Sequence, residues 1–149
     1  MRKQGVLPVE IEVEVPFHDV DLARIVWHGH YLKYLENARW ALMDRLGYGL
    51  DSMLSAGEGW PIVDVAVKHL RVARFRDRLR VRASLLEWEY RLVINYLVTD
   101  VLTGERVARA QTTQVLVDAA SGEMRFELPR SFVQRVEAAI AAVAGADGR

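Results

Sequence analysis

A single long amphipathic helix, followed by an unbroken series of strands, limits the architectures open to this chain. From Tyr31 to Leu46 apolar residues recur every three or four positions, which is the spacing of a helix with one buried face. Gly47 follows as a C-terminal stop. Such a helix needs a second layer to cover its apolar face, and the rest of the sequence predicts that this layer is a sheet.

The strands are marked by two kinds of pattern. Before the helix, valine and isoleucine alternate with glutamate up to Pro16, as in a strand with one buried and one wet face. After the helix, residues 62–70 are largely apolar on both faces, which predicts a central strand. Further strands with short links are expected at residues 78–89, 92–102 and 107–117, with a bulge near Leu85 and a hairpin turn at Thr103-Gly104.

These elements predict an α+β fold in a single domain, residues 1–149. Successive strands with short links pair antiparallel, and a second amphipathic helix follows Pro129. Alternating βαβ units are absent from the pattern, as are a glycine-rich phosphate loop and a Gly-x-Ser-x-Gly turn. Rossmann and barrel enzymes are therefore disfavoured.

Composition narrows the functional classes further. Hydrophobic residues make up 51% of the chain and charged residues 27%, which excludes a disordered protein and leaves no apolar run long enough for a membrane span. The formal net charge of +0 argues against nucleic acid or an anionic membrane as a partner. With no cysteine in the chain, disulfides and thiolate chemistry are excluded. Residues 1–4 begin no apolar signal segment, so we expect a cytoplasmic protein.

The segment from Phe17 to Tyr31 concentrates chemistry-bearing side chains. It contains two aspartates and three of the chain's 4 histidines, which are His18, His28 and His30. We expect no metal site here, because the histidines lack helical metal-ligand spacing and a third fixed ligand.

The motif Asp19-Val20-Asp21, then Ile25-Val26-Trp27-His28, then Tyr31 at the start of a helix, resembles the signature of the 4-hydroxybenzoyl-CoA thioesterase family. The Tol-Pal-associated branch of short-chain acyl-CoA thioesterases is also similar. The likeness continues through residues 34–39, 61–63 and 73–79.

The resemblance implies a hotdog fold, in which an antiparallel sheet wraps around the long helix, and a hydrolase that cleaves acyl-CoA thioesters. Coenzyme A then enters as part of the substrate, with no other cofactor. The resemblance also implies a homodimer whose sheets join edge to edge, or a homotetramer, with each active site at a subunit boundary.

The resemblance assigns Asp21 as the catalytic carboxylate and matches His28 to the histidine of the Tol-Pal-associated branch. Physical chemistry makes the arrangement plausible, because free N–H groups at a helix N-terminus stabilise charge developing on a carbonyl oxygen. We expect these donors to be the backbone N–H of His28 or Gly29. Asp21 then attacks the carbonyl carbon as a nucleophile or directs water at it as a general base, and the sequence leaves both routes open.

The remaining predicted roles concern substrate binding and the loop. Phe17, Trp27 and Tyr31 are candidate substrate contacts, and Arg74 and Arg76 are candidates for the phosphates of coenzyme A. We expect Asp19 to hold the loop through turn hydrogen bonds. Three positions depart from the family pattern: Arg24 replaces a usual glycine, Phe17 a tyrosine of the Tol-Pal branch, and His30 a customary asparagine.

Other functions compatible with this fold stay open. A thioesterase acting on acyl carrier protein is the alternative within the enzyme class, and a hydratase of the same fold is less favoured. The alternative outside the enzyme class is a non-catalytic acyl-CoA-binding protein. The presence of Arg24 in place of the usual glycine is the feature that suggests it. The acyl group, short-chain or aromatic, is not fixed by the sequence.

Overall fold

The computed structural model describes residues 4–147. The ends of the predicted domain, residues 1–3 and 148–149, lie outside the described residues, as does most of the N-terminal stretch examined for a signal segment. The elements in chain order are β1 (Val6–Glu14), η1 (Phe17–Asp19), η2 (His28–His30), α1 (Tyr31–Arg45), α2 (Leu50–Ser55), β2 (Glu58–Gly59), β3 (Ile62–His69), β4 (Arg78–Glu87), β5 (Leu92–Asp100), β6 (Arg106–Gln114), β7 (Leu116–Asp118), β8 (Met124–Arg125) and α3 (Arg130–Asp147).

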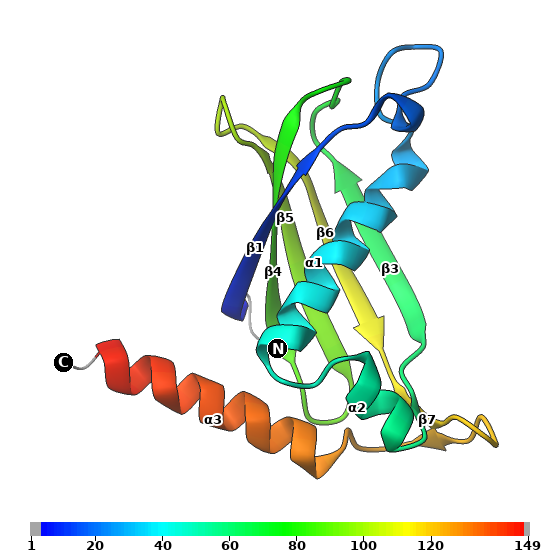
Figure 1. Cartoon of the computed structure of the whole chain (residues 1–149), viewed down its shortest axis with the longest axis vertical. Helices are drawn as coiled ribbons and strands as arrows, with labels where there is room; N and C mark the ends of the chain where they lie inside the picture. Colours follow the sequence, from blue (N-terminus) through cyan, green and yellow to red (C-terminus); the bar gives the residue numbers. More distant parts are fainter. Residues whose placement is uncertain (1–3, 148–149) are drawn as a thin grey trace.

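A five-stranded antiparallel sheet curves around α1, as Figure 1 shows. The strand order is β1-β4-β5-β6-β3, and β2, β7 and β8 form a small second sheet. This is the hotdog arrangement that the sequence predicted, an α+β fold with a helix against one antiparallel sheet and a helix at the C-terminus.

The buried face of α1 matches the predicted stripe. Tyr31, Tyr34, Leu35, Ala38 and Leu42 are all buried against the sheet. Burial of such a face supplies most of a helix's stability in a protein. The helix ends where predicted, with Gly47 at a φ of 71°, the left-handed conformation that favours glycine.

Pairing of β4 with its neighbours confirms one sequence prediction about an irregular position. The register of β4 with β5 shifts between Leu85 and Glu87, so the expected bulge is present. On the wet face of the sheet, glutamates of β1 lie opposite arginines of β4, with Glu12 paired to Arg80 and Glu14 to Arg78.

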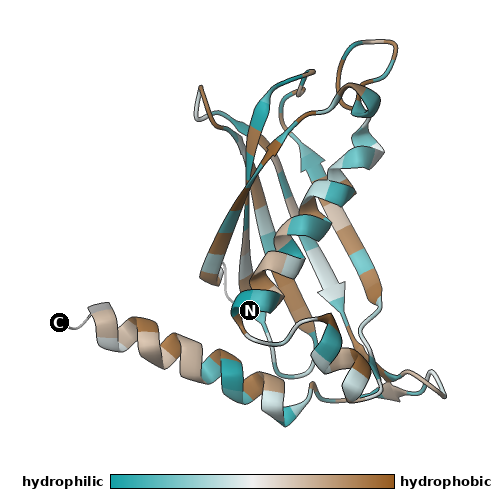
Figure 2. Ribbon diagram, in the orientation of Figure 1, coloured by the Kyte–Doolittle hydropathy of each residue, from teal (hydrophilic) through white to brown (hydrophobic). Residues whose placement is uncertain are grey.

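The prediction that residues 62–70 form a central strand is wrong. β3 is the edge strand of the sheet, paired only with β6 among the described strands. Ile62, Val63 and Val65 are 38%, 58% and 41% exposed, and Figure 2 shows hydrophobic residues along this open edge. Among residues 4–147 no strand pairs with the outer edge of β3, although the strand is rich in apolar residues.

α3 leaves the body of the molecule at its base (Figure 1). Phe132 and Val136 in its first turns are fully buried, whereas residues 141–146 are exposed. No helix in the part of the chain that the structure describes combines the length and apolarity needed to cross a bilayer.

Candidate active site

Asp21 is presented by a small hairpin between η1 and η2. Val20 and Val26 form an antiparallel bridge, and the Asp21 N–H donates to the Ile25 carbonyl at 3.0 Å. Arg24 closes the turn at a φ of 64°, a left-handed conformation that costs a residue with a Cβ about 1 kcal/mol or more. This is the conformation that favours glycine, which is the residue that the family resemblance leads one to expect here.

The Asp21 side chain is exposed on the single chain. Its Oδ1 accepts the N–H of Ala23 at 2.8 Å, which fixes the carboxylate within the turn. Within residues 4–147, Oδ2 has no hydrogen-bond partner and Asp21 has no ion pair. One carboxylate oxygen is therefore free to act as a base or nucleophile.

Asp19, two residues upstream, is in the opposite situation. It is only 1% exposed and accepts hydrogen bonds from Lys33 Nζ at 2.5 Å and from the Tyr34 hydroxyl at 2.6 Å. Burial acts to raise the pKa of Asp19, but these two hydrogen bonds and the charges of Lys33 and His30 outweigh it and hold that pKa below its usual range. Asp19 holds the loop as expected, although its side chain does so by bonding to α1 rather than within a turn.

The chain enters α1 through the single turn η2, which leaves two N–H groups free. The His30 N–H donates to the Trp27 carbonyl at 2.9 Å and the Trp27 N–H to the Asp19 carbonyl at 3.0 Å. The N–H groups of His28 and Gly29 have no acceptor among residues 4–147. These unpaired donors lie at the positive end of a continuous helical segment, where a developing negative charge is stabilised.

Gly29 leaves room for the side chain of Trp27. A Cβ atom at Gly29 would collide with the six-membered ring of the Trp27 indole. The indole is 49% exposed and also contacts the rings of His28 and His30, with centroids 5.0 Å and 5.2 Å away. Trp27 therefore forms a half-exposed aromatic wall beside the two free N–H groups.

Two further candidate substrate contacts lie in different environments. Phe17 is 74% exposed and meets Phe75 edge-on, with ring centroids 5.8 Å apart. Tyr31 is 3% exposed, and burial raises the pKa of its hydroxyl, although a hydrogen bond with the backbone of Ala73 lowers it. Tyr31 is thus an inner wall of this end of the molecule, whereas Phe17 lies on its surface.

The arginines of residues 74–80 lie in two different environments. Arg78 and Arg80 lie near glutamates of β1, with Arg78 Nη2 3.1 Å from Glu12 Oε2. The side chains of Arg74 and Arg76, in the link from β3 to β4, form no ion pair within residues 4–147. No acidic side chain among residues 4–147 therefore pairs with the two arginines that the sequence suggested for phosphate binding.

A fourth histidine joins this end of the molecule from the far strand of the sheet. His69, the last residue of β3, lies edge-on to Tyr31 at a centroid distance of 4.9 Å and 6.4 Å from the ring of His28. Nothing in the sequence singles out His69, because it lies 41 positions after His28. The position of His69 beside Tyr31 and His28 follows only from the pairing of β3 with β6.

An apolar groove of about 260 Å³ opens between α1 and β3, starting at the first turn of α1. Arg39 Nη1 is buried and has no hydrogen-bond partner in the described part of the chain. Arg39 also forms an ion pair with Glu36. The groove is lined by Leu32, Lys33, Leu35, Glu36, Arg39, Ile62, Val65, Tyr96 and Thr112.

The histidines at this end do not form a metal centre. Among residues 4–147 no group of three or more histidine, aspartate or glutamate side chains is arranged to hold a metal ion. The arrangement instead combines a free carboxylate, two free backbone N–H groups and imidazoles. These are the components of acyl transfer to water, in which a base or nucleophile acts on a carbonyl polarised by donors.

Comparison with known proteins decides the family. The model of the thioesterase-like superfamily matches residues 15–139. The chain belongs to the thioesterase-like superfamily. The prediction that the chain is a thioester hydrolase of the hotdog fold is confirmed.

A curated relative is similar in sequence, and solved structures share the fold. A protein of Synechocystis sp. assigned as an esterase is 29% identical over 127 residues, covering 80% of this chain and 73% of that protein. The DHNA-CoA thioesterase from Staphylococcus aureus superposes with a TM-score of 0.81 at 21% identity, covering 95% of each chain. The 4-hydroxybenzoyl-CoA thioesterase from Pseudomonas sp. strain CBS-3 gives 0.77 at 23% identity, covering 86% and 98%.

Proposed function

We propose that this protein hydrolyses an acyl-CoA thioester of short or aromatic acyl chain at the end of the molecule where α1 begins. The observation that carries the proposal is the pair of free N–H groups on His28 and Gly29. They follow seven and eight residues after Asp21, whose carboxylate has a free oxygen. The carbonyl oxygen accepts from these donors, which stabilise the negative charge that develops on it. The Asp21 carboxylate then acts on the carbonyl carbon directly or through water.

Binding of coenzyme A by Arg74 and Arg76 completes the proposal. Both side chains lie in the link that bridges to the catalytic hairpin, where Ile25 pairs with Arg74. Uncompensated guanidinium groups attract phosphates. The double variant Arg74→Gln/Arg76→Gln should raise KM for an acyl-CoA but not for the same acyl group on N-acetylcysteamine, which lacks phosphates. Arg80→Gln is the control, because Arg80 lies near Glu10 and Glu12.

The direct test of the function is hydrolysis of a panel of acyl-CoA esters by the wild-type protein and by Asp21→Asn. We expect turnover of at least one ester by the wild type, and a loss of about 10²–10⁴-fold in the variant, which is the range of general acid–base catalysis. The same acyl groups on acyl carrier protein are measured in parallel. If the acyl carrier protein form were hydrolysed faster by orders of magnitude, the substrate would be acyl carrier protein and not coenzyme A. If neither form were hydrolysed, the protein would be a non-catalytic binding protein.

We further propose that the working unit is a dimer joined along β3. The strand is an open edge with exposed Ile62, Val63 and Val65, and open apolar edges are ordinarily covered. A second copy paired there would also wall the groove between α1 and β3.

Sedimentation or light scattering tests this assembly. Val63→Glu places a charge on the proposed interface and should lower the measured mass to that of one chain, with activity falling in parallel. Leu102→Glu, in the exposed turn between β5 and β6 where Leu102 is 87% exposed, is the matched control and should keep the wild-type mass. A monomeric wild type would contradict the proposal, and a wild-type mass of four chains would extend it to a tetramer.

A further inference from the structure

His69 ends β3 at the edge of the sheet that lies beside η2 and the start of α1 (Figure 1). Alternation along the strand places it on the same face as Val65, which lines the groove against α1. The imidazole thus reaches the candidate site from an element that contributes none of the residues assigned to it above.

The His69 ring is held against a fixed wall. It stands edge-on to Tyr31 at 4.9 Å and 74°, and Tyr31 is buried in the first turn of α1. Aromatic edge contacts of this kind favour one orientation of the ring. The imidazole itself remains exposed, so it is oriented without being enclosed.

The ring also faces the imidazole of His28, at 6.4 Å and 80°. His28 carries one of the two free N–H groups that would hold the thioester oxygen. The His69 imidazole is therefore a neighbour of the residue that would hold the thioester carbonyl, and the sulfur bonded to the carbonyl carbon would lie in the same region.

Hydrolysis of a thioester needs two proton transfers. On the general-base route of the function proposed above, water adds to the carbonyl carbon and gives up one proton to Asp21. The carbon–sulfur bond then breaks, and the electron pair stays on sulfur as a thiolate that takes a proton to leave as the thiol. The products are one carboxylic acid and one thiol, so the atoms of thioester and water are accounted for.

We propose that His69 is the proton donor to this departing sulfur. An imidazolium is the side chain best suited to give a proton near neutral pH. Asp21 and His69 come from different elements, the hairpin after η1 and the end of β3, so one can receive a proton while the other gives one. His28 keeps the role of binding and orienting the carbonyl, since its own N–H is a donor there and its ring leans on Trp27 at 5.0 Å.

The test compares leaving groups and rests on the proposed thioesterase function. His69→Gln is assayed on an acyl-CoA that the wild type hydrolyses and on the same acyl group esterified to 5-mercapto-2-nitrobenzoate, an acidic thiol that leaves without protonation. We expect kcat to fall by about 10²-fold on the CoA ester and by less than about threefold on the activated ester. His69→Phe, which keeps an aromatic ring against Tyr31, should show the same pattern.

His18→Gln is the matched control, because His18 lies at the same end with its side chain 78% exposed and only a 3.8 Å contact to Asp19. It should leave both rates unchanged. Equal losses on the two esters, an unaffected His69→Gln, or recovery of CoA hydrolysis by His69→Phe would each overturn the role of His69 while leaving the thioesterase function standing. A wild type that cleaves neither ester would instead overturn the function itself.

Discussion

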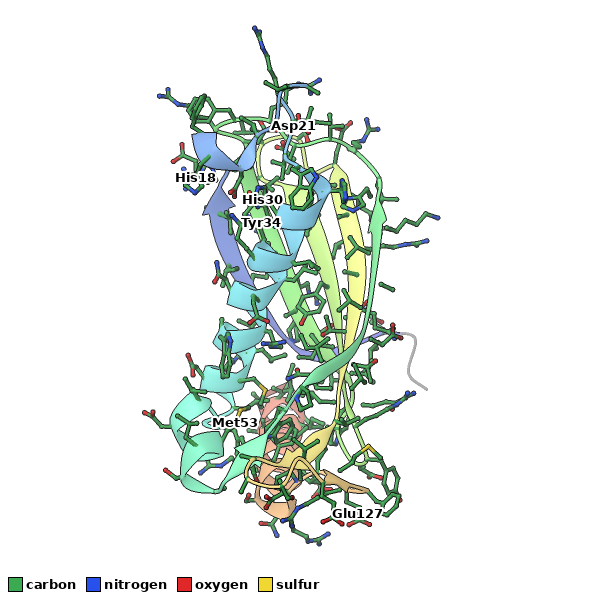
Figure 3. All side chains as sticks on the ribbon, turned by 90° about the vertical axis from the view of Figure 1, so that its right-hand side faces the viewer. His18, Asp21, His30, Tyr34, Met53 and Glu127 are labelled. Carbon is green, nitrogen blue, oxygen red and sulfur yellow. The ribbon has the colours of Figure 1, made fainter. Side chains whose placement is uncertain are left out.

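The two ends of the molecule differ in their cavities and in how their polar groups are paired. Figure 3 shows His18, Asp21 and His30 at one end and Met53 and Glu127 at the other. The base, around α2 and the start of α3, contains a larger cavity of about 460 Å³ and a cluster of aromatic rings. The tip, around η1 and η2, has a narrower groove nearby but carries the free donors and the free carboxylate.

Several polar side chains at the base are paired, although Gln114 Oε1, buried beside Trp60, has no hydrogen-bond partner among residues 4–147. Glu58 accepts hydrogen bonds from the Tyr48 hydroxyl at 2.6 Å and from Trp60 Nε1 at 3.2 Å. Burial, together with the bond to Glu58, raises the pKa of Tyr48 to about 12, so this phenol stays neutral and structural. The free carboxylate oxygen of Asp21 and the free N–H groups of His28 and Gly29, rather than cavity volume, distinguish the tip, which is the proposed reactive end, from the base.

Substitutions at the base of the molecule should therefore lower the stability of the fold and leave catalysis unchanged. Phe132 is fully buried between Tyr48 and Trp60, with ring centroids at 5.3 Å and 5.2 Å. Phe132→Ala leaves a cavity and should lower the free energy of unfolding by about 3–5 kcal/mol. Urea unfolding measures this loss, while kcat per folded molecule should stay at the wild-type value. A large fall in kcat with unchanged stability would reverse the assignment of the two ends.

Asp19 is the exception that sharpens the comparison, because it lies at the tip and yet is buried and paired. Asp19→Asn removes the charge that Lys33 and Tyr34 bind, and should lower the free energy of unfolding by about 2 kcal/mol. The folded pKa lies below the ordinary value of 3.8. The stabilisation is therefore complete above that value and is lost as pH falls through the folded pKa.

Urea unfolding of both proteins at neutral pH and near pH 3 checks this account. The difference between wild type and Asp19→Asn should be largest at neutral pH and should shrink in acid. The variant at Asp21, which is exposed and unpaired, should unfold like the wild type at both values. A difference at Asp19 that is constant with pH would mean that the carboxylate charge does not stabilise the loop.

Gly29→Ala tests the tip by shape alone. The new methyl group meets the Trp27 indole, which is half-exposed and can swing aside. We expect the free energy of unfolding to stay within about 0.5 kcal/mol of wild type and kcat/KM to fall about tenfold, because the wall beside the N–H donors moves. Gly57→Ala is a useful contrast: a Cβ there meets no neighbouring atom but is strained by a φ of 67°, so it should affect stability and not kcat/KM.

Local patterns in the sequence predicted the parts of this molecule that local forces determine. The alternation before Pro16 predicted β1, the spacing from Tyr31 predicted α1, and the disturbed phase at Leu85 predicted the bulge. The position of β3 was beyond such reasoning. An apolar pattern reports that a strand avoids water, but it does not report whether the covering surface belongs to the same chain.

The candidate site shows the same division. The motif pointed to the segment that contains Asp21 and His28, whereas the buried bonds of Asp19 to Lys33 and Tyr34 depend on how the hairpin docks on α1. His69 depends on the whole sheet, since the register of β3 on β6 sets how far the strand extends beside η2. Contacts between distant segments require the folded topology, and sequence spacing carries no trace of them.

The smallest expected effect concerns the turn that presents Asp21. Arg24 adopts a φ of 64°, so Arg24→Gly relieves backbone strain in the folded state while adding freedom to the unfolded chain. These effects oppose each other, and the free energy of unfolding should change by less than about 1 kcal/mol. Because the hairpin bonds from Asp21 to Ile25 and Ala23 do not involve the Arg24 side chain, kcat should stay within about twofold of wild type. Thermal unfolding and steady-state kinetics measure both. A gain of tenfold or more in kcat would show that arginine at this position holds the carboxylate away from its working geometry, and that the tip, unlike the base, has its reactivity limited by one residue of the turn.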